Sequence, residues 1–219
     1  MGGIFSYDSK LSKGFRTVMD AVIMNLLFIV CSLPVVTLGA SAAALYSGIR
    51  ELMRERKEED SEKEPIRVFL KAFKEGFRTI TALSAICTAL IAALGYNLIL
   101  VLVYHYSGLN APVILSLIGL ALIWVFWCSA SLMHANFSCR FGLLCRNAFN
   151  LMFAYPIRAV VTAALLLLPP AVGLFNMYYL LMGMPVWILV YFSLSMMTVR
   201  LMWRRVFEKL KSVAVIEET

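Results

Sequence analysis

Three long windows without charged side chains constrain this chain more than any other feature. No Lys, Arg, Asp or Glu falls within 21–49, 79–139 or 159–199. Because about 20 apolar residues cross a bilayer as a helix, these windows hold about six crossings. Hydrophobic residues make up 61% of the chain and charged residues only 15%, which excludes an ordinary water-soluble domain. We therefore expect an all-α, polytopic transmembrane helical bundle that forms a single integral membrane domain.

Basic residues are concentrated in some of the connections between these helices. The loops near 104–111 and 181–184 carry no Lys or Arg, whereas 134–158 and 204–211 carry several. Cationic loops stay in the cytoplasm by the positive-inside rule. The sequence therefore predicts a membrane protein whose C-terminus is cytoplasmic.

The first 78 residues leave two topologies open. Cations before residue 17 and throughout 50–78 place both segments in the cytoplasm, so the chain between them crosses an even number of times. Residues 17–34 are long enough for one crossing, but 35–49 would form only about 22 Å of helix. We expect a tight hairpin turning at Pro34–Gly39, and thus six spans and a cytoplasmic N-terminus. The alternative has five spans and an external N-terminus.

Thr37 and Ser41 are the candidate caps of the helix that returns from this turn. The complete division predicts three helical hairpins joined by cytosolic segments: hairpin 17–57, linker 58–65, interfacial helix 66–77, hairpin 78–134, cytosolic segment 135–157, hairpin 158–205 and cytosolic tail 206–219.

A weak internal pattern suggests that the three hairpins are repeats. The tetrapeptide at 14–17 recurs at 76–79, and Tyr96-Asn97 is answered by Phe175-Asn176. Three parallel units of this kind would match repeats seen in transporters. Topology alone also places an Arg at each inner helix start, so the pattern has a second explanation.

Residues 66–78 have the pattern of an amphipathic, basic helix. Aromatic residues recur at every fourth position, and cations form a second stripe. Such a helix lies on anionic lipid or docks a partner protein. The candidate interfacial or partner-docking residues are Phe69, Lys71, Phe73, Lys74, Phe77 and Arg78.

Few polar side chains fall within the predicted spans. Asp20 lies four positions after Arg16, near the inner interface, and is expected to be a paired anchor. Asn25 lies deeper and is expected to hydrogen-bond across helices. Asn97 and Asn176 lie near the outer ends of their helices, where such side chains cap helix ends.

The sequence indicates neither an enzyme nor a cofactor protein. It has no phosphate-binding loop and no zinc-protease motif. The five cysteines show no metal-ligand spacing, and the cations flank apolar windows, which argues against nucleic-acid binding. We expect no catalytic, cofactor-binding or metal residues.

Several short stretches resemble the YesL family of bacterial membrane proteins. They are Gly3–Asp8, Asn25–Leu27, Leu33–Ser41 and Phe69–Phe77, with a weaker likeness around Arg146. The family is a domain of unknown function whose members often accompany sugar ABC transporters. The resemblance implies a non-enzymatic accessory protein in carbohydrate uptake, with the bilayer and an ABC transporter permease as partners. The alternative is a small permease or channel that acts alone.

Overall fold

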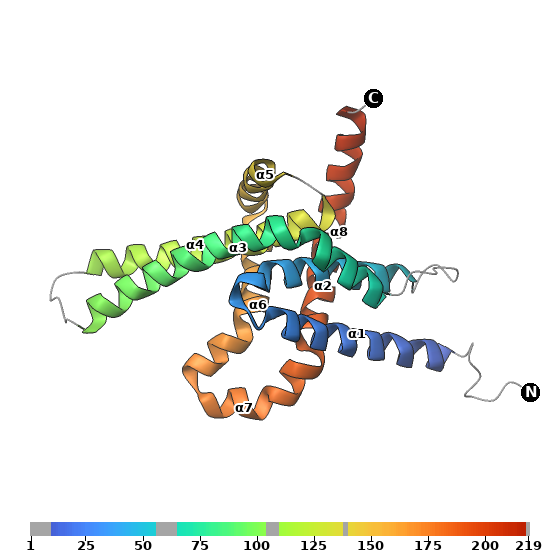
Figure 1. Cartoon of the computed structure of the whole chain (residues 1–219), viewed down its shortest axis with the longest axis horizontal. Coiled ribbons are helices and arrows are strands. Elements are labelled where there is room, and N and C mark those ends of the chain that lie inside the picture. The colour runs from blue at the N-terminus through green and yellow to red at the C-terminus, as the bar shows by residue number, and fades with distance from the viewer. Residues whose placement is uncertain (1–9, 56–64, 104–109, 138–139, 218–219) are drawn as a thin grey trace, which may run out of the picture.

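The computed structural model describes residues 10–55, 65–103, 110–137 and 140–217, and these residues form helices joined by short connections (Figure 1). The predicted all-α class is therefore confirmed. Parts of the predicted linker 58–65 and tail 206–219, and the stretch Gly3–Asp8, lie outside the described residues. The elements are α1 (Lys10–Ser32), η1 (Val35–Thr37), α2 (Leu38–Glu55), α3 (Pro65–Val103), α4 (Asn110–Asn136), α5 (Phe141–Ala154), α6 (Pro156–Phe175), α7 (Met177–Val186), the π-helical segment η2 (Trp187–Tyr191) and α8 (Phe192–Glu217).

Five stretches of helix in the described part of the chain are long and apolar enough to cross a membrane. They lie in α1, α3, α4 and α6, and in the run from α7 to α8. Helix α2 is not among them, because its 18 residues include Arg50, Glu51, Arg54 and Glu55. By length and composition the described chain thus offers five spans, and α2 packs against α1 without being one of them.

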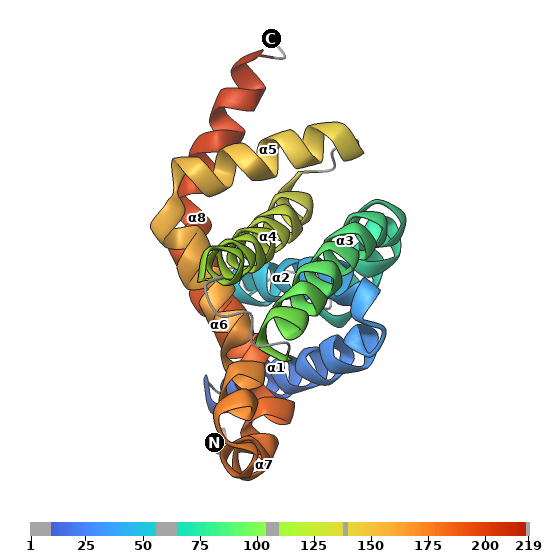
Figure 2. The same ribbon diagram turned by 90° about the vertical axis from the view of Figure 1, so that its left-hand side faces the viewer.

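Helix α2 is instead the buried centre of the structure. It packs against α1, α3, α4 and α8, and Figure 2 shows it between them. Residues 39–49 are all buried. This stretch is rich in Ala, Ser and Gly, and small residues let neighbouring helix backbones approach closely where no bulky side chain separates them.

Gly39 lies at a close approach of α2 to α3 and α4. Trp127 Nε1 donates a hydrogen bond to Ser84 Oγ over 2.9 Å, and this pair joins α3 to α4 directly above Gly39. A Cβ atom at Gly39 would lie 2.6 Å from Trp127 Nε1 and would also collide with Ser84 Oγ. The absence of a side chain at Gly39 therefore leaves room for the buried hydrogen bond between Trp127 and Ser84.

The turn between α1 and α2 lies where the sequence predicts it, but its hydroxyl groups act differently. Thr37 Oγ1 donates to the carbonyl oxygens of Cys31 and Pro34, at 2.5 and 2.7 Å. Ser41 Oγ lies 2.6 Å from Ser32 Oγ and donates to Leu38 O. Thr37 thus satisfies one carbonyl group at the end of α1 and one in the turn, and Ser41 links the two helices. In the hydrogen bonds of the described residues, neither side chain accepts from the N-terminal amides of α2.

The predicted interfacial helix 66–77 is not a separate element. It forms the beginning of α3, which runs without interruption for 39 residues, or about 58 Å at 1.5 Å per residue. This is nearly twice the thickness of a hydrocarbon core. The helix continues through residues 66–80 without a break. Gly76 is not at a turn; its backbone lies against the side chain of His134. The separate amphipathic helix is α5, which runs across the end of α4 (Figure 2).

The third hairpin differs from the second in both shape and direction. Helices α3 and α4 are continuous, whereas the chain between α6 and α8 is broken at Asn176 and again at η2. Asn97, the proposed counterpart of Asn176, lies within α3. Helices α6 and α8 also run across α3 and α4 (Figures 1 and 2). The hypothesis of three parallel repeats therefore fails at the outer half of the hairpins.

Replacing Gly39 by Ala tests the packing around α2. We expect Gly39→Ala to lower the free energy of unfolding in detergent by about 1–3 kcal/mol, because overpacking displaces the Ser84–Trp127 pair. Gly95→Ala on α3 is the control, since a Cβ atom there meets nothing within 4 Å and should stabilise slightly through helix propensity. Equal stability of the two variants would contradict the packing described here.

Candidate functional site

Asn25 on α1 makes three hydrogen bonds to the backbone of another helix. Its Nδ2 donates to the carbonyl oxygens of Trp187, at 3.1 Å, and Ile188, at 2.6 Å. Its Oδ1 accepts from the backbone N–H of Ser193 over 2.9 Å. The side chain is fully buried. Asn25 therefore hydrogen-bonds to backbone groups across the interface between α1 and the segment leading into α8.

These bonds coincide with the π-helical segment η2. A π-helical turn disturbs the regular pairing between N–H groups and carbonyls four residues earlier, and such turns recur at functional sites. In an apolar region a free carbonyl is costly, because no water replaces its partner. Asn25 supplies both a donor and an acceptor at this point, so its amide compensates for the irregular backbone.

Ser193 and Tyr191 extend this polar cluster. Ser193 Oγ donates to Ala21 O over 2.7 Å, so Ser193 of α8 donates two hydrogen bonds to α1, one from its backbone N–H and one from its hydroxyl group. Tyr191 Oη donates to Leu165 O over 2.7 Å, which attaches η2 to α6. We name Asn25, Tyr191 and Ser193, with the backbone groups they bind, the Asn25 cluster.

Apolar packing surrounds the Asn25 cluster and keeps its hydrogen bonds dry. Met24 and Ser193 are fully buried, and the ring centroids of Phe28 and Phe192 lie 4.8 Å apart across the same interface. Hydrogen bonds between membrane helices are each worth about 0.6–2 kcal/mol. The cluster therefore attaches α1, α6 and the segment formed by η2 and α8 to one another, which is a structural role.

The other polar residues predicted within the spans do not join this cluster. Asp20 is half-buried on α1 and is engaged in an interaction there. Asn97 is exposed on α3. Asn176 is the N-cap of α7, where its Oδ1 accepts from the N–H of Tyr178 over 2.9 Å.

The predicted docking segment divides into a buried aromatic side and an exposed cationic side. Phe69 is fully buried and Phe73 packs against the core, so Phe69 is not available to a partner. Phe77 remains 44% exposed. Lys71, Lys74 and Arg78 are exposed. The accessible surface is therefore mainly cationic, and Phe77 is the one phenylalanine of the stripe that is exposed.

Arg50 has a structural role that the sequence did not indicate. Its Nη1 donates to Ala135 O over 3.1 Å and lies 3.4 Å from Asn136 Oδ1, at the C-terminus of α4. Burial lowers the pKa of the Arg50 guanidinium from its ordinary value, but an arginine stays protonated in proteins. A cation at this end of a helix is favourable because the last carbonyls carry partial negative charge.

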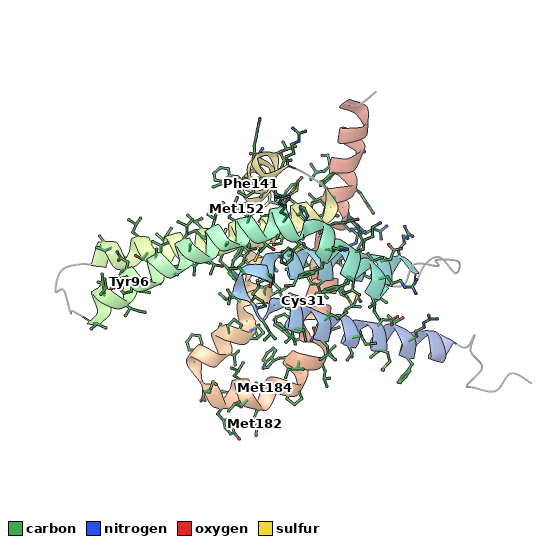
Figure 3. The ribbon with its side chains drawn as sticks, in the orientation of Figure 1. Cys31, Tyr96, Phe141, Met152, Met182 and Met184 are labelled. Atoms are coloured by element: carbon green, nitrogen blue, oxygen red, sulfur yellow. The ribbon has the colours of Figure 1, made fainter. Side chains whose placement is uncertain are left out.

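Exposed apolar side chains cover most of the outer surface. Tyr96 on α3 and Met182 on α7 are 64% and 66% exposed, and Figure 3 shows both far from the buried centre. Large apolar areas of this kind mark contact with lipid or protein. Among the described residues no group of three or more His, Cys, Asp or Glu could hold a metal ion.

The fold and its surface thus define a multi-pass helical membrane protein. Residues 21–98 match the model of the family DUF624, described as a protein of unknown function, which is the family of YesL-like bacterial membrane proteins. The resemblance stated from the sequence is therefore confirmed over α2 and large parts of α1 and α3, including Asn25 and Gly39. No curated protein and no solved structure matches the chain.

Replacing Asn25 by Ala tests the cluster. We expect Asn25→Ala to lower the free energy of unfolding by about 1–3 kcal/mol, because buried carbonyl and N–H groups lose their partners. Amide hydrogen exchange at Ser193 should also accelerate. Asn97→Ala is the matched control, since Asn97 is exposed and such changes stay within about 0.5 kcal/mol. If Asn25→Ala behaves like Asn97→Ala, the cluster does not hold η2.

Proposed function

We propose that this protein is a non-enzymatic accessory subunit that binds the permease of a carbohydrate ABC transporter in the bacterial cell membrane. The observation that carries the proposal is the length of α3 together with the exposed cations at its start. This helix is about 58 Å long, so some of it extends beyond any bilayer it crosses. The projecting part presents exposed cations while its other face is packed into the protein.

The exposed face suits a protein partner better than a lipid surface alone. An interfacial helix binds lipid by placing large apolar side chains in the membrane. Here much of the apolar stripe packs inside the protein, because Phe69 is buried and Phe73 contacts the core. The surface that remains carries a row of cations, Arg67, Lys71, Lys74 and Arg78, interrupted by Glu75, with Leu70 and Phe77 as its exposed apolar side chains. Such a surface favours a partner with complementary acidic groups.

The proposal also includes the link to carbohydrate transport and the orientation of the protein in the membrane. The family resemblance implies a neighbouring carbohydrate transporter, which selects the permease as the partner to test. Both termini lie in the cytoplasm in this proposal, since the segments around α5 and at the end of α8 are cationic. With both termini on the same side, the chain crosses the membrane an even number of times. In this proposal α2 therefore supplies the return crossing of the first hairpin, inside the protein.

A small permease is the second candidate function, and η2 is the observation that favours it. Transporters often place interrupted helices at their binding sites, and π-helical turns recur at functional sites. Solute flux into liposomes that contain this protein alone would support the second candidate over the first.

Charge reversal on α3 tests the accessory role. We expect Lys71→Glu combined with Lys74→Glu to reduce cross-linking to the permease in native membranes by about tenfold or more, since like-charge contacts replace complementary ones. The yield of the permease adduct, identified by mass spectrometry, is the measurement.

The matched control is Arg205→Glu combined with Lys209→Glu, which reverses two exposed cations on α8. This control should keep the adduct, because these positions lie outside α3. Equal cross-linking by both double variants would count against docking through α3, and absence of any permease adduct in the unaltered protein would refute the proposed partner.

A further inference from the structure

A hollow of about 320 Å³ lies where α5 meets the end of α4 and the last part of α8. Its floor is apolar and includes Met133, Leu151 and Leu210. Its polar groups are the amides of Asn147 and Asn150 and the side chain of Tyr155. Small-molecule sites have this composition, a mainly apolar cavity with a few polar groups that fix orientation.

Two arginines, Arg146 and Arg158, lie next to residues that line the hollow. Arg146 precedes Asn150 by four residues on α5, so both lie on the same face of that helix. The guanidinium carbon of Arg158 lies 5.5 Å from the ring centre of Tyr155, which itself lines the hollow. Residues 134–158 contain three arginines and no carboxylate. The hollow therefore favours an anionic group at its edge and an apolar group inside.

The exposed side of α5 next to Arg146 is suited to the membrane interface. Phe149 and Phe153 are 53% and 59% exposed, and their ring centroids lie 4.6 Å apart. Met152 faces the protein, lying between α5 and α4 (Figure 3). A helix with exposed aromatics and cations binds at the level of lipid headgroups. The hollow beside it thus opens where lipid is the most abundant amphiphile.

We propose that this hollow binds one anionic phospholipid. The phosphate lies between Arg146 and Arg158, the Asn147 and Asn150 amides contact the glycerol region, and an acyl chain fills the apolar floor. Chain burial removes apolar surface from water, and the arginines select anionic over zwitterionic headgroups. This site is separate from the α3 surface and does not depend on any permease.

Native mass spectrometry of the full chain in nonionic detergent tests the proposal. The probes are phosphatidylglycerol and phosphatidylcholine with identical acyl chains, and glycerol phosphate as the headgroup without chains. We expect one phosphatidylglycerol to be retained several-fold more than phosphatidylcholine, and glycerol phosphate not to be retained. Equal retention of both lipids, or retention of glycerol phosphate alone, would overturn the proposal.

Three variants assign the retained lipid to this hollow. Arg146→Gln and Arg158→Gln should each weaken phosphatidylglycerol retention about fivefold, the effect of losing roughly 1 kcal/mol per cation. Ala154→Leu keeps every charge but narrows the hollow, so it should reduce retention of both lipids. Arg205→Gln removes an exposed cation of α8 outside the hollow and should change nothing.

The altered residues on α5 and α8 are exposed, and unchanged elution on size exclusion would verify folding. Comparison of the two lipids on the unaltered protein does not depend on any variant. Retention that falls equally in Arg205→Gln and Arg146→Gln would show general charge attraction and would refute a site in the hollow.

Discussion

The hydrogen bonds between Asn25 and η2 are the contacts on which the arrangement of the helices depends most. An irregular backbone turn in an apolar region is costly unless another group satisfies its carbonyls and N–H groups. One buried amide on α1 meets three such groups, and Ser193 returns a bond to α1. Because α8 starts at this point, the cluster determines where the whole C-terminal helix lies against the first.

Helix α2 gives the interior a different kind of stability. Its small residues allow four other helices to pack closely around it, and Arg50 attaches its far end to the C-terminus of α4. The same packing buries Phe69 at the start of α3 and brings Phe73 against the core, so the accessible surface of this segment is mainly cationic. One face of α3 thus packs inside the protein, and another face of the same helix forms the proposed partner surface.

Much of this fold can be predicted from charge-free windows, because lipid exposure demands long apolar helices. The turn near Pro34 also follows from the sequence, and Asn25 stands out as a buried amide. The role of Phe69 could not be predicted, since an aromatic stripe has the same spacing whether it faces lipid or protein. The π-helical turn has no local signal either: it depends on Asn25, 162 residues earlier than Trp187.

Cross-linking between α1 and α8 in native membranes tests the central claim most directly. Ser193 Oγ contacts Ala21 O and both residues are buried, so paired Ala21→Cys and Ser193→Cys substitutions place two thiols on facing residues, where oxidation can join them directly as a disulfide. The account predicts an intramolecular disulfide cross-link in the double variant and none in either single variant. Two thiols that both react with a monofunctional label after unfolding, yet never form the disulfide in native membranes, would contradict it.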